Sequence, residues 1–216
     1  MSSLTLAYGQ PTLADRVFSR TLVTDIVLVA AGAALVSLAA QLTIPLWPVP
    51  ITGQTFAVLL VGATLGPLRA AISLALYAVI GVVGLPVFAD GGSGALWGST
   101  SGGFVIGFIF AAPLVGWLAQ RQWDHKVLKT FVAFAAGTVV IYAFGLPWLY
   151  AVLSTFPAAV MTEYFGTTDV LAATVNGGIV PFLVGDTIKA LLAAAVLPLT
   201  WRLIANADKR KASEED

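Results

Sequence analysis

Residues 22–41 read LVTDIVLVAAGAALVSLAAQ and contain one charged side chain, that of Asp25. The stretch has the ~20 predominantly apolar residues that a helix needs to cross the hydrocarbon core of a bilayer. Residues 102–119, GGFVIGFIFAAPLVGWLA, form a second run of similar character. A soluble chain of 216 residues has no core large enough to hide such runs, so we expect them to lie in lipid.

The composition agrees with a membrane environment and excludes several classes of function. Hydrophobic residues make up 58% of the chain and charged residues only 10%, against roughly 25% charged in a typical soluble domain. The formal net charge is zero, and the one dense basic tract is at the C-terminus, so nucleic-acid binding is not expected. The absence of cysteine excludes disulfides, thiolate metal sites and thiol nucleophiles.

We expect an all-α integral membrane protein whose six transmembrane helices lie at residues 22–41, 55–66, 68–83, 102–120, 128–146 and 178–204. The second and third are short, and residues 55–83 could instead form one helix kinked at Gly66-Pro67. Six helices place ten basic residues on one side of the membrane and none on the other, as the positive-inside rule requires. These residues are Arg16, Arg20, Arg69, Arg121, Lys126, Lys129, Arg202, Lys209, Arg210 and Lys211.

Six spans put both termini in the cytoplasm, with the protein in the cell membrane. The chain then divides into an N-terminal cytoplasmic segment (1–21), a membrane domain (22–204) and a charged, mobile tail (205–216). The first span could also be a cleaved signal peptide, but the spans that follow and the charge topology favour a retained helix. The tryptophans support this topology, because they sort to the two interfaces. Trp47, Trp97 and Trp148 fall at outer ends, and Trp117, Trp123 and Trp201 at inner ends.

The outer connections are long, nearly uncharged and rich in glycine and aromatic residues. Residues 84–103 contain seven glycines, which predicts a loop that folds closely over something. Residues 150–177 carry Glu163, Asp169 and Asn176. Loops of this length are often lids or binding loops, although this one could instead be a disordered connector.

Two ionisable residues, Asp186 and Lys189, lie well inside a predicted span, within GDTIKA at 185–190. Each costs on the order of 3 kcal/mol at the centre of an inserted helix, and their spacing places them on one helix face. If the helix begins near Gly178, Lys189 lies roughly 16 Å along it. The pair is either a structural ion pair or, as we favour, a ligand site in which Lys189 meets an anionic group and Asp186 accepts hydrogen bonds from ligand N–H groups.

Other polar residues give weaker signals. Asp25 is expected to cap or neutralise the inner end of its helix, and His125 to be a solvated loop residue. Ala30, Ala34 and Ser37 have the small-xxx-small spacing that lets another helix approach closely, although ordinary internal packing would look the same. One histidine and no cysteine cannot build a metal cluster, and no Walker A, H-E-x-x-H or G-x-S-x-G motif is present. Transport would therefore draw its energy from a gradient or a partner.

Four motifs occur in order: PVPITGQT at 48–55, GLPVF at 84–88, GGFVIGF at 102–108 and GDTIKA at 185–190. Together they resemble the BioY family, the biotin-binding membrane subunits of energy-coupling factor transporters, over roughly residues 22–203. The resemblance implies a six-helix substrate-binding component that faces outward and associates with a transmembrane coupling protein and a pair of cytoplasmic ATPases. It maps the family's acid and lysine onto Asp186 and Lys189, and its Ala-xxx-Ala coupling motif onto Ala30 and Ala34. Family members often have Gly-Pro-Thr-Gly-Gly-Tyr before the fourth helix, where this chain reads GSTSGGF at 98–104.

Biotin fits the residues already singled out. Its carboxylate suits Lys189, and its ureido N–H groups need acceptors such as Asp186 or Asn176. Its apolar ring and chain suit the glycine-rich loop, where the expected contacts are Phe88, Trp97 and Thr100. The resemblance implies no cofactor, metal or catalytic residue.

Two other functions stay open at this point. One is a secondary carrier for a small carboxylate that couples to protons through Asp186. The other, less favoured, is an intramembrane enzyme, for which the absence of cysteine and of intramembrane histidine leaves only Ser, Thr, Asp, Glu or Lys as reactive groups.

Overall fold

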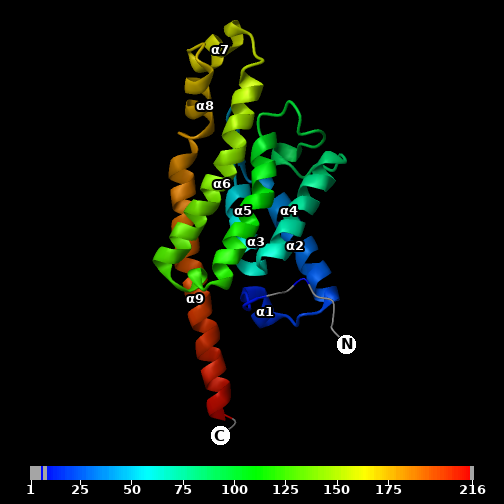
Figure 1. The fold of residues 1–216 in the computed structure, drawn as a ribbon, viewed down its shortest axis with the longest axis vertical. Helices are drawn as coiled ribbons and strands as arrows, with labels where there is room; N and C mark the ends of the chain where they lie inside the picture. Colours follow the sequence, from blue (N-terminus) through cyan, green and yellow to red (C-terminus); the bar gives the residue numbers. More distant parts are fainter. Residues whose placement is uncertain (1–5, 7–8, 215–216) are drawn as a thin grey trace.

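The computed structural model describes residue 6 and residues 9–214, which form a mostly helical bundle (Figure 1). A short antiparallel pair of strands, β1 (Thr43–Ile44) and β2 (Ile51–Thr52), joins the second and third helices. Two single 3-10 turns, η1 (Ala89–Gly91) and η2 (Trp123–His125), lie in connections. The helices are α1 (Leu13–Val17), α2 (Leu22–Ala40), α3 (Gln54–Leu65), α4 (Pro67–Val82), α5 (Gly102–Gln120), α6 (Val127–Leu153), α7 (Ala158–Phe165), α8 (Val170–Gly178) and α9 (Phe182–Glu214).

The structure confirms an all-helical membrane protein. In the described part of the chain, four helical stretches are long and apolar enough to cross a bilayer: α2, α5, α6 and the stretch that includes α9. The helices α3 and α4 are also apolar but have only 12 and 16 residues, so they reach roughly 18 and 24 Å.

A tight turn at Gly66-Pro67 separates α3 from α4, so residues 55–83 are not one kinked helix. Gly66 has φ +84° and ψ 175°, a conformation open essentially to glycine alone. Pro67 follows as the first residue of α4, where its missing N–H has no helical partner to lose. A Cβ at Gly116 of α5 would lie 2.6 Å from the Gly66 carbonyl carbon, so α5 packs directly against this turn.

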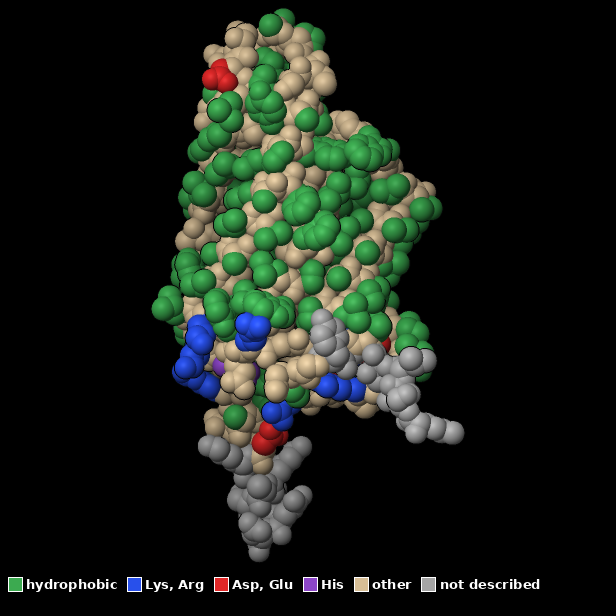
Figure 2. All heavy atoms as spheres, viewed as in Figure 1, with side chains coloured by type: hydrophobic (Ala, Val, Ile, Leu, Met, Phe, Trp, Pro, Cys, Tyr) green, Lys and Arg blue, Asp and Glu red, His purple; other side chains and the backbone are tan. Residues whose placement is uncertain are grey.

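The core forms around α5, which packs on α3, α4 and α6. Phe108, Ala111, Ala112 and Val115 of α5 are all buried. Close approach depends on small residues, because lipid supplies no hydrophobic force between helices and packing must hold them together. Apolar side chains cover the middle of the molecule, and Lys and Arg gather below them (Figure 2).

Two predicted boundaries are wrong because helices continue or restart where the sequence suggested a break. The helix expected to end before Pro147 runs through it to Leu153, since neighbouring elements in membrane bundles compensate for proline. The connection 150–177, expected to be a loop, contains α7 and α8. Gly166 ends α7 with φ +66°, and the Asp169 carboxylate caps α8 by accepting from the N–H groups of Leu171 and Ala172.

The last helix also begins later than predicted. A break at 179–181 separates α8 from α9, which starts at Phe182 instead of Gly178. Lys189 is therefore roughly 10 Å along its helix. The helix continues to Glu214, well past residue 204.

The two ends of the molecule differ (Figure 1). The helices α7 and α8 stand at one end. The other, which we call the charged end, holds α1, the α5–α6 connection and the C-terminal part of α9.

Candidate functional site

The turn that precedes α3 and the first turn of α3 together present two oxygen acceptors to the interior. The Thr52 hydroxyl donates to Gln54 Oε1 at 2.9 Å and accepts from the Gln54 N–H at 3.2 Å. The Gln54 amide in turn donates to the hydroxyl of Tyr77 on α4. These bonds hold the turn in place, so the Thr52 carbonyl and the Thr55 hydroxyl face α9.

Lys189 uses the three donors of its ammonium group on this turn and on its own helix. Nζ donates to Thr55 Oγ1 at 2.6 Å, to the Thr52 carbonyl at 3.1 Å and to Asp186 Oδ1 at 3.4 Å. The longest of the three contacts is therefore the one to Asp186.

Asp186 links Lys189 to α6. Its Oδ2 accepts a hydrogen bond of 2.5 Å from the Tyr142 hydroxyl. Only 11% of the Asp186 side chain and 18% of the Lys189 side chain are exposed. Such low exposure favours keeping the two opposite charges together, because a buried charge is stable only when it is paired and hydrogen-bonded.

These groups line a pocket with otherwise apolar walls. The pocket holds about 530 Å³ of space between atoms, including the part open to solvent. Its apolar walls include Val49, Phe104, Val105, Phe108, Ile141 and Phe182. A few convergent polar groups in such a lining suit a small molecule with a polar end and an apolar body.

The structure brings Phe88 and Thr100 close to this pocket without placing them in its wall. Phe88 packs edge-on against Tyr77 and fills the space above Gly81. It lines a neighbouring hollow that shares Pro50 and Gln54 with the pocket. The Thr100 hydroxyl donates to the Pro48 carbonyl and so ties the glycine-rich loop to the segment before α3.

Trp97 and Asn176 lie away from the pocket. The Trp97 side chain is 80% exposed and stacks on Trp148 with ring centroids 5.0 Å apart. Asn176 is exposed on α8. Of the residues expected to contact ligand, Asp186 and Lys189 thus lie in the wall of the pocket. Phe88 and Thr100 lie next to the pocket but not in its wall.

Sequence reasoning did not single out Tyr142, Gln54 or Thr55. The last two fall within the motif at 48–55, so that motif was the available signal. Tyr142 had none, because a tyrosine between apolar residues in a membrane helix looks like an ordinary packing residue.

Ala30 and Ala34 are exposed on the surface of α2. Within the described residues, no three His, Asp or Glu side chains gather to hold a metal ion.

His125 is half-buried, not solvated as predicted, because its ring stacks on Trp201 with centroids 4.1 Å apart. Burial and the nearby charge of Arg16 lower its pKa.

Comparisons with known proteins show the family of the chain. Residues 10–206 match the model of the BioY family. The biotin transporter BioY of Rhizobium etli is 34% identical over 181 residues, which are 79% of this chain and 89% of the relative. The biotin transporter BioY of Thermotoga maritima is 35% identical over 165 residues, 76% of this chain and 87% of the relative.

One solved structure shares the fold. It is described as the S-component for biotin from an ECF-type ABC transporter. The two chains superpose with a TM-score of 0.65 at 23% identity, over 83% of this chain and 92% of the other.

Proposed function

Because the chain belongs to the BioY family, we propose that it captures biotin from outside the cell and delivers it inward as the substrate-binding subunit of an ATP-driven importer. The family consists of transport proteins, so no enzymatic role is proposed. The observation that carries the proposal is the Asp186–Lys189 pair in an apolar pocket. Biotin has matching chemistry: a carboxylate at one end, a ureido group at the other, and an apolar ring and chain between them.

In the proposed complex the biotin carboxylate takes the place of Asp186 on the Lys189 ammonium, and the contacts to Thr52 and Thr55 remain. The ureido group lies at the other end of biotin and cannot reach Asp186 at the same time, because Asp186 Oδ1 is only 3.4 Å from the Lys189 Nζ. Asp186 therefore keeps its hydrogen bond from Tyr142. Phe104 and Phe108 offer apolar surface to the ring and chain. Phe88 and Thr100 act from behind the pocket by holding the glycine-rich loop, whereas Trp97 and Asn176 are not part of the proposal.

The proposed topology has six membrane helices, α2 to α6 and α9, with both termini in the cytoplasm. It keeps the division into residues 1–21, 22–204 and 205–216. The distribution of charge supports this orientation, because Arg121, Lys126 and Lys129 lie between the inner ends of α5 and α6 or in the first turn of α6, as the positive-inside rule expects. The pocket then opens toward the outer face.

The proposed partners are a transmembrane coupling protein and a pair of cytoplasmic ATPases. Ala30 and Ala34 support the first of these, because they lie on an exposed apolar face of α2 and small residues allow close helix contact. The lack of a Walker A motif in this chain supports the second, since ATP hydrolysis then falls to another subunit.

The test is equilibrium binding of labelled biotin to the purified protein in nanodiscs. Lys189→Ala is expected to weaken binding by at least a hundredfold, because hydrogen bonds and charge pairing in a buried site are both lost. Lys126→Ala, at an exposed lysine of the charged end, is the matched control and is expected to bind as the wild type does. Biotin methyl ester, which lacks the negative charge, should bind wild type and Lys189→Ala about equally weakly.

Normal biotin binding by Lys189→Ala would contradict the proposed site. No binding of biotin to folded wild-type protein would contradict the proposed substrate. Uptake by the chain alone that follows an imposed pH gradient would instead indicate the secondary carrier coupled through Asp186.

A further inference from the structure

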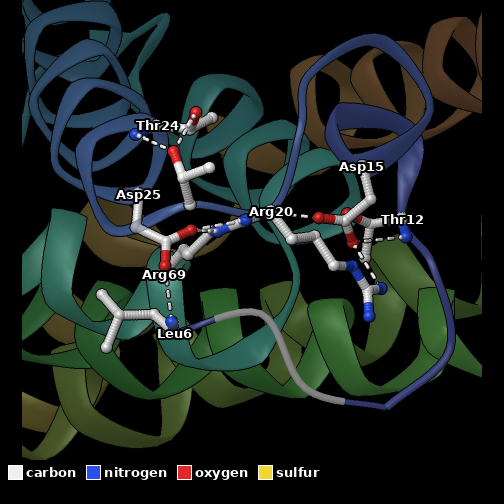
Figure 3. Close-up of polar contacts among 8 residues, drawn as sticks. Leu6, Thr12, Asp15, Arg20, Thr24, Asp25 and Arg69 are labelled. Carbon is white, nitrogen blue, oxygen red and sulfur yellow. Dashed lines mark hydrogen bonds and ion pairs between the residues drawn. The ribbon is translucent and has the colours of Figure 1, made fainter. Parts of the chain in front are cut away.

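A second group of buried charges joins α1, α2 and α4 (Figure 3). Arg69 of α4 is at its centre. Its Nε and Nη2 contact Asp25 Oδ1 at 2.7 and 2.5 Å, and its Nη1 donates to Asp15 Oδ1 at 2.7 Å. Arg20 Nη2 completes the group by donating to Asp15 Oδ2 at 3.0 Å. The group thus contains two arginines and two aspartates.

This group is almost completely buried, and its carboxylate oxygens all have hydrogen-bond donors. The side chains of Arg69, Asp25 and Asp15 are 1%, 0% and 4% exposed. The Leu6 N–H donates to Asp25 Oδ2 and the Thr12 N–H to Asp15 Oδ2, so all four carboxylate oxygens have donors. Burial raises the pKa of Asp15, but the hydrogen bonds from Thr12, Arg20 and Arg69 outweigh burial and leave the pKa below its ordinary value.

Asp25 is the sole charged residue of α2, and Arg69 the sole charged residue of α4. Asp25 falls on the buried stripe of α2, together with Val29, Ala33 and Val36. The exposed face of the same helix holds Ala30 and Ala34. The ion pair therefore lies on the opposite side of α2 from the proposed contact with the coupling protein.

The rest of the α2–α4 interface does little to fix the rotation of α2. It is built from small and apolar side chains, and a Cβ at Gly32 would lie 2.7 Å from Ser73 Oγ, which shows how close the helices are. In lipid, alternative packings of such apolar surfaces differ little in free energy. A shift by one residue turns a helix by about 100°, and a single buried polar pair is a known device for fixing register.

We propose that Arg69 is a positioning residue for transport, which by pairing with Asp25 fixes the rotation of α2 so that the Ala30–Ala34 face points out of the bundle toward the coupling protein. The coupling role of that face rests on the proposed function. The rotation of α2 does not, because it is a property of this chain alone.

The test combines two variants with a spectroscopic readout. The first is Asp25→Asn with Arg69→Met, which removes both charges and leaves neither unpaired. The matched control is Arg16→Gln with Asp208→Asn, which removes an exposed pair 4.0 Å apart. Nitroxide labels at Ile26 and Leu35 report rotation, because nine residues place them about 180° apart at the two edges of the exposed face. The chain has no cysteine, so each introduced cysteine is labelled alone.

In the Asp25→Asn, Arg69→Met protein, the oxygen accessibility of the two labels is expected to change in opposite directions. Biotin binding by the isolated subunit should stay within about threefold of wild type, because neither Asp25 nor Arg69 lines the pocket. ATP-driven uptake by the assembled transporter should fall at least tenfold. The control should change none of these. Unchanged accessibility at both positions would overturn the inference, whether or not uptake falls, and so would normal uptake.

Arg69→Lys decides the matter if the neutral double variant does not fold. Lysine keeps the charge but cannot contact both aspartates with a guanidinium fork. At each label we therefore expect a change in the same direction as in the double variant, but smaller. If the accessibility of neither label changed, the inference would be overturned. If wild type fails to bind biotin, the proposed function fails, and the two accessibilities still decide whether Arg69 sets the rotation of α2.

Discussion

Lys189 and Thr55 are 134 residues apart in the sequence, yet the Lys189 ammonium donates a hydrogen bond of 2.6 Å to the Thr55 hydroxyl. This bond joins α9 to the start of α3 across the pocket. It also fixes where the positive charge lies before any ligand arrives.

Thr55→Val is expected to weaken biotin binding roughly tenfold, because valine keeps the shape of threonine but removes an acceptor from a charged donor. The measurement is the Kd for labelled biotin. Thr64→Val is the matched control on the same helix, since the Thr64 hydroxyl bonds only to backbone carbonyls of its own helix. An unchanged Kd for Thr55→Val would show that Thr55 does not orient Lys189.

Tyr142→Phe removes the hydroxyl that donates to Asp186. We expect the Kd for biotin to rise several-fold, because Asp186 without this bond is no longer held in place beside Lys189. The effect is a fraction of the about 1.5–3 kcal/mol that a hydrogen bond to a charged group contributes. Tyr150→Phe, at an exposed tyrosine of the same helix, serves as the control and should bind normally. Tighter binding in Tyr142→Phe would mean that the hydroxyl competes with the ligand for Asp186.

Asp124 makes the stability depend on pH. Burial raises its pKa to about 6, although a hydrogen bond from the Trp201 N–H opposes the rise. Oδ1 has no hydrogen-bond partner within the described structure. A raised pKa means that the folded protein holds the proton more tightly than the unfolded chain does, so stability falls as pH rises from about 4 to about 6, by about 3 kcal/mol in all.

Asp124→Asn should therefore raise the midpoint of thermal unfolding at about pH 7.5 and have less effect at about pH 5. Glu163→Gln, at an exposed residue of α7, is the control and should change neither value. Asp15 does not contribute to this pH dependence. Because its pKa is lowered, the stability that it contributes is lost only at a pH below the range in which Asp124 titrates. An equal shift at both pH values would contradict the role of burial.

Gly62→Ala is expected to destabilise the bundle by about 1–3 kcal/mol through overpacking. A Cβ at this position would lie 2.4 Å from the Ala112 carbonyl oxygen of α5. Gly185→Ala is the matched helical control, because nothing lies within 4 Å of its added Cβ. Thermal unfolding in detergent measures both variants, and equal midpoints would show that α3 and α5 do not need this close approach.

The residues that the sequence revealed best were those that are expensive in lipid. Asp186 and Lys189 stood out because a charge in an apolar helix needs a reason, and the structure places both in the pocket. Tyr142 was not predictable in this way, since a tyrosine ring is common in a membrane helix. Only the contact of its hydroxyl with Asp186, seen in the fold, gives that hydroxyl a role. The predicted helix boundaries are wrong where packing in the bundle overrides a local signal, as at Pro147, which lies inside α6. They are also wrong where a break such as 179–181 depends on tertiary contacts.

The short helices α7 and α8 do have local signals in the sequence. Gly166 is a typical helix end, and Asp169 is a typical N-cap. The pairing of Asp25 with Arg69 was also beyond sequence reasoning, because the two residues are 44 positions apart. The expectation that Asp25 neutralises charge at the inner end agrees with that pair, but its partner appears only in the fold.

The three filled donors of Lys189 have a consequence for selectivity in the living cell. The ammonium and the Asp186 carboxylate cancel at short range, so the empty pocket projects little field into the medium. Chloride and phosphate, which are far more abundant than any vitamin, then gain little by entering. Discrimination rests on the ability of a molecule to replace a particular hydrogen bond and fill an apolar space, and it should vary little with ionic strength.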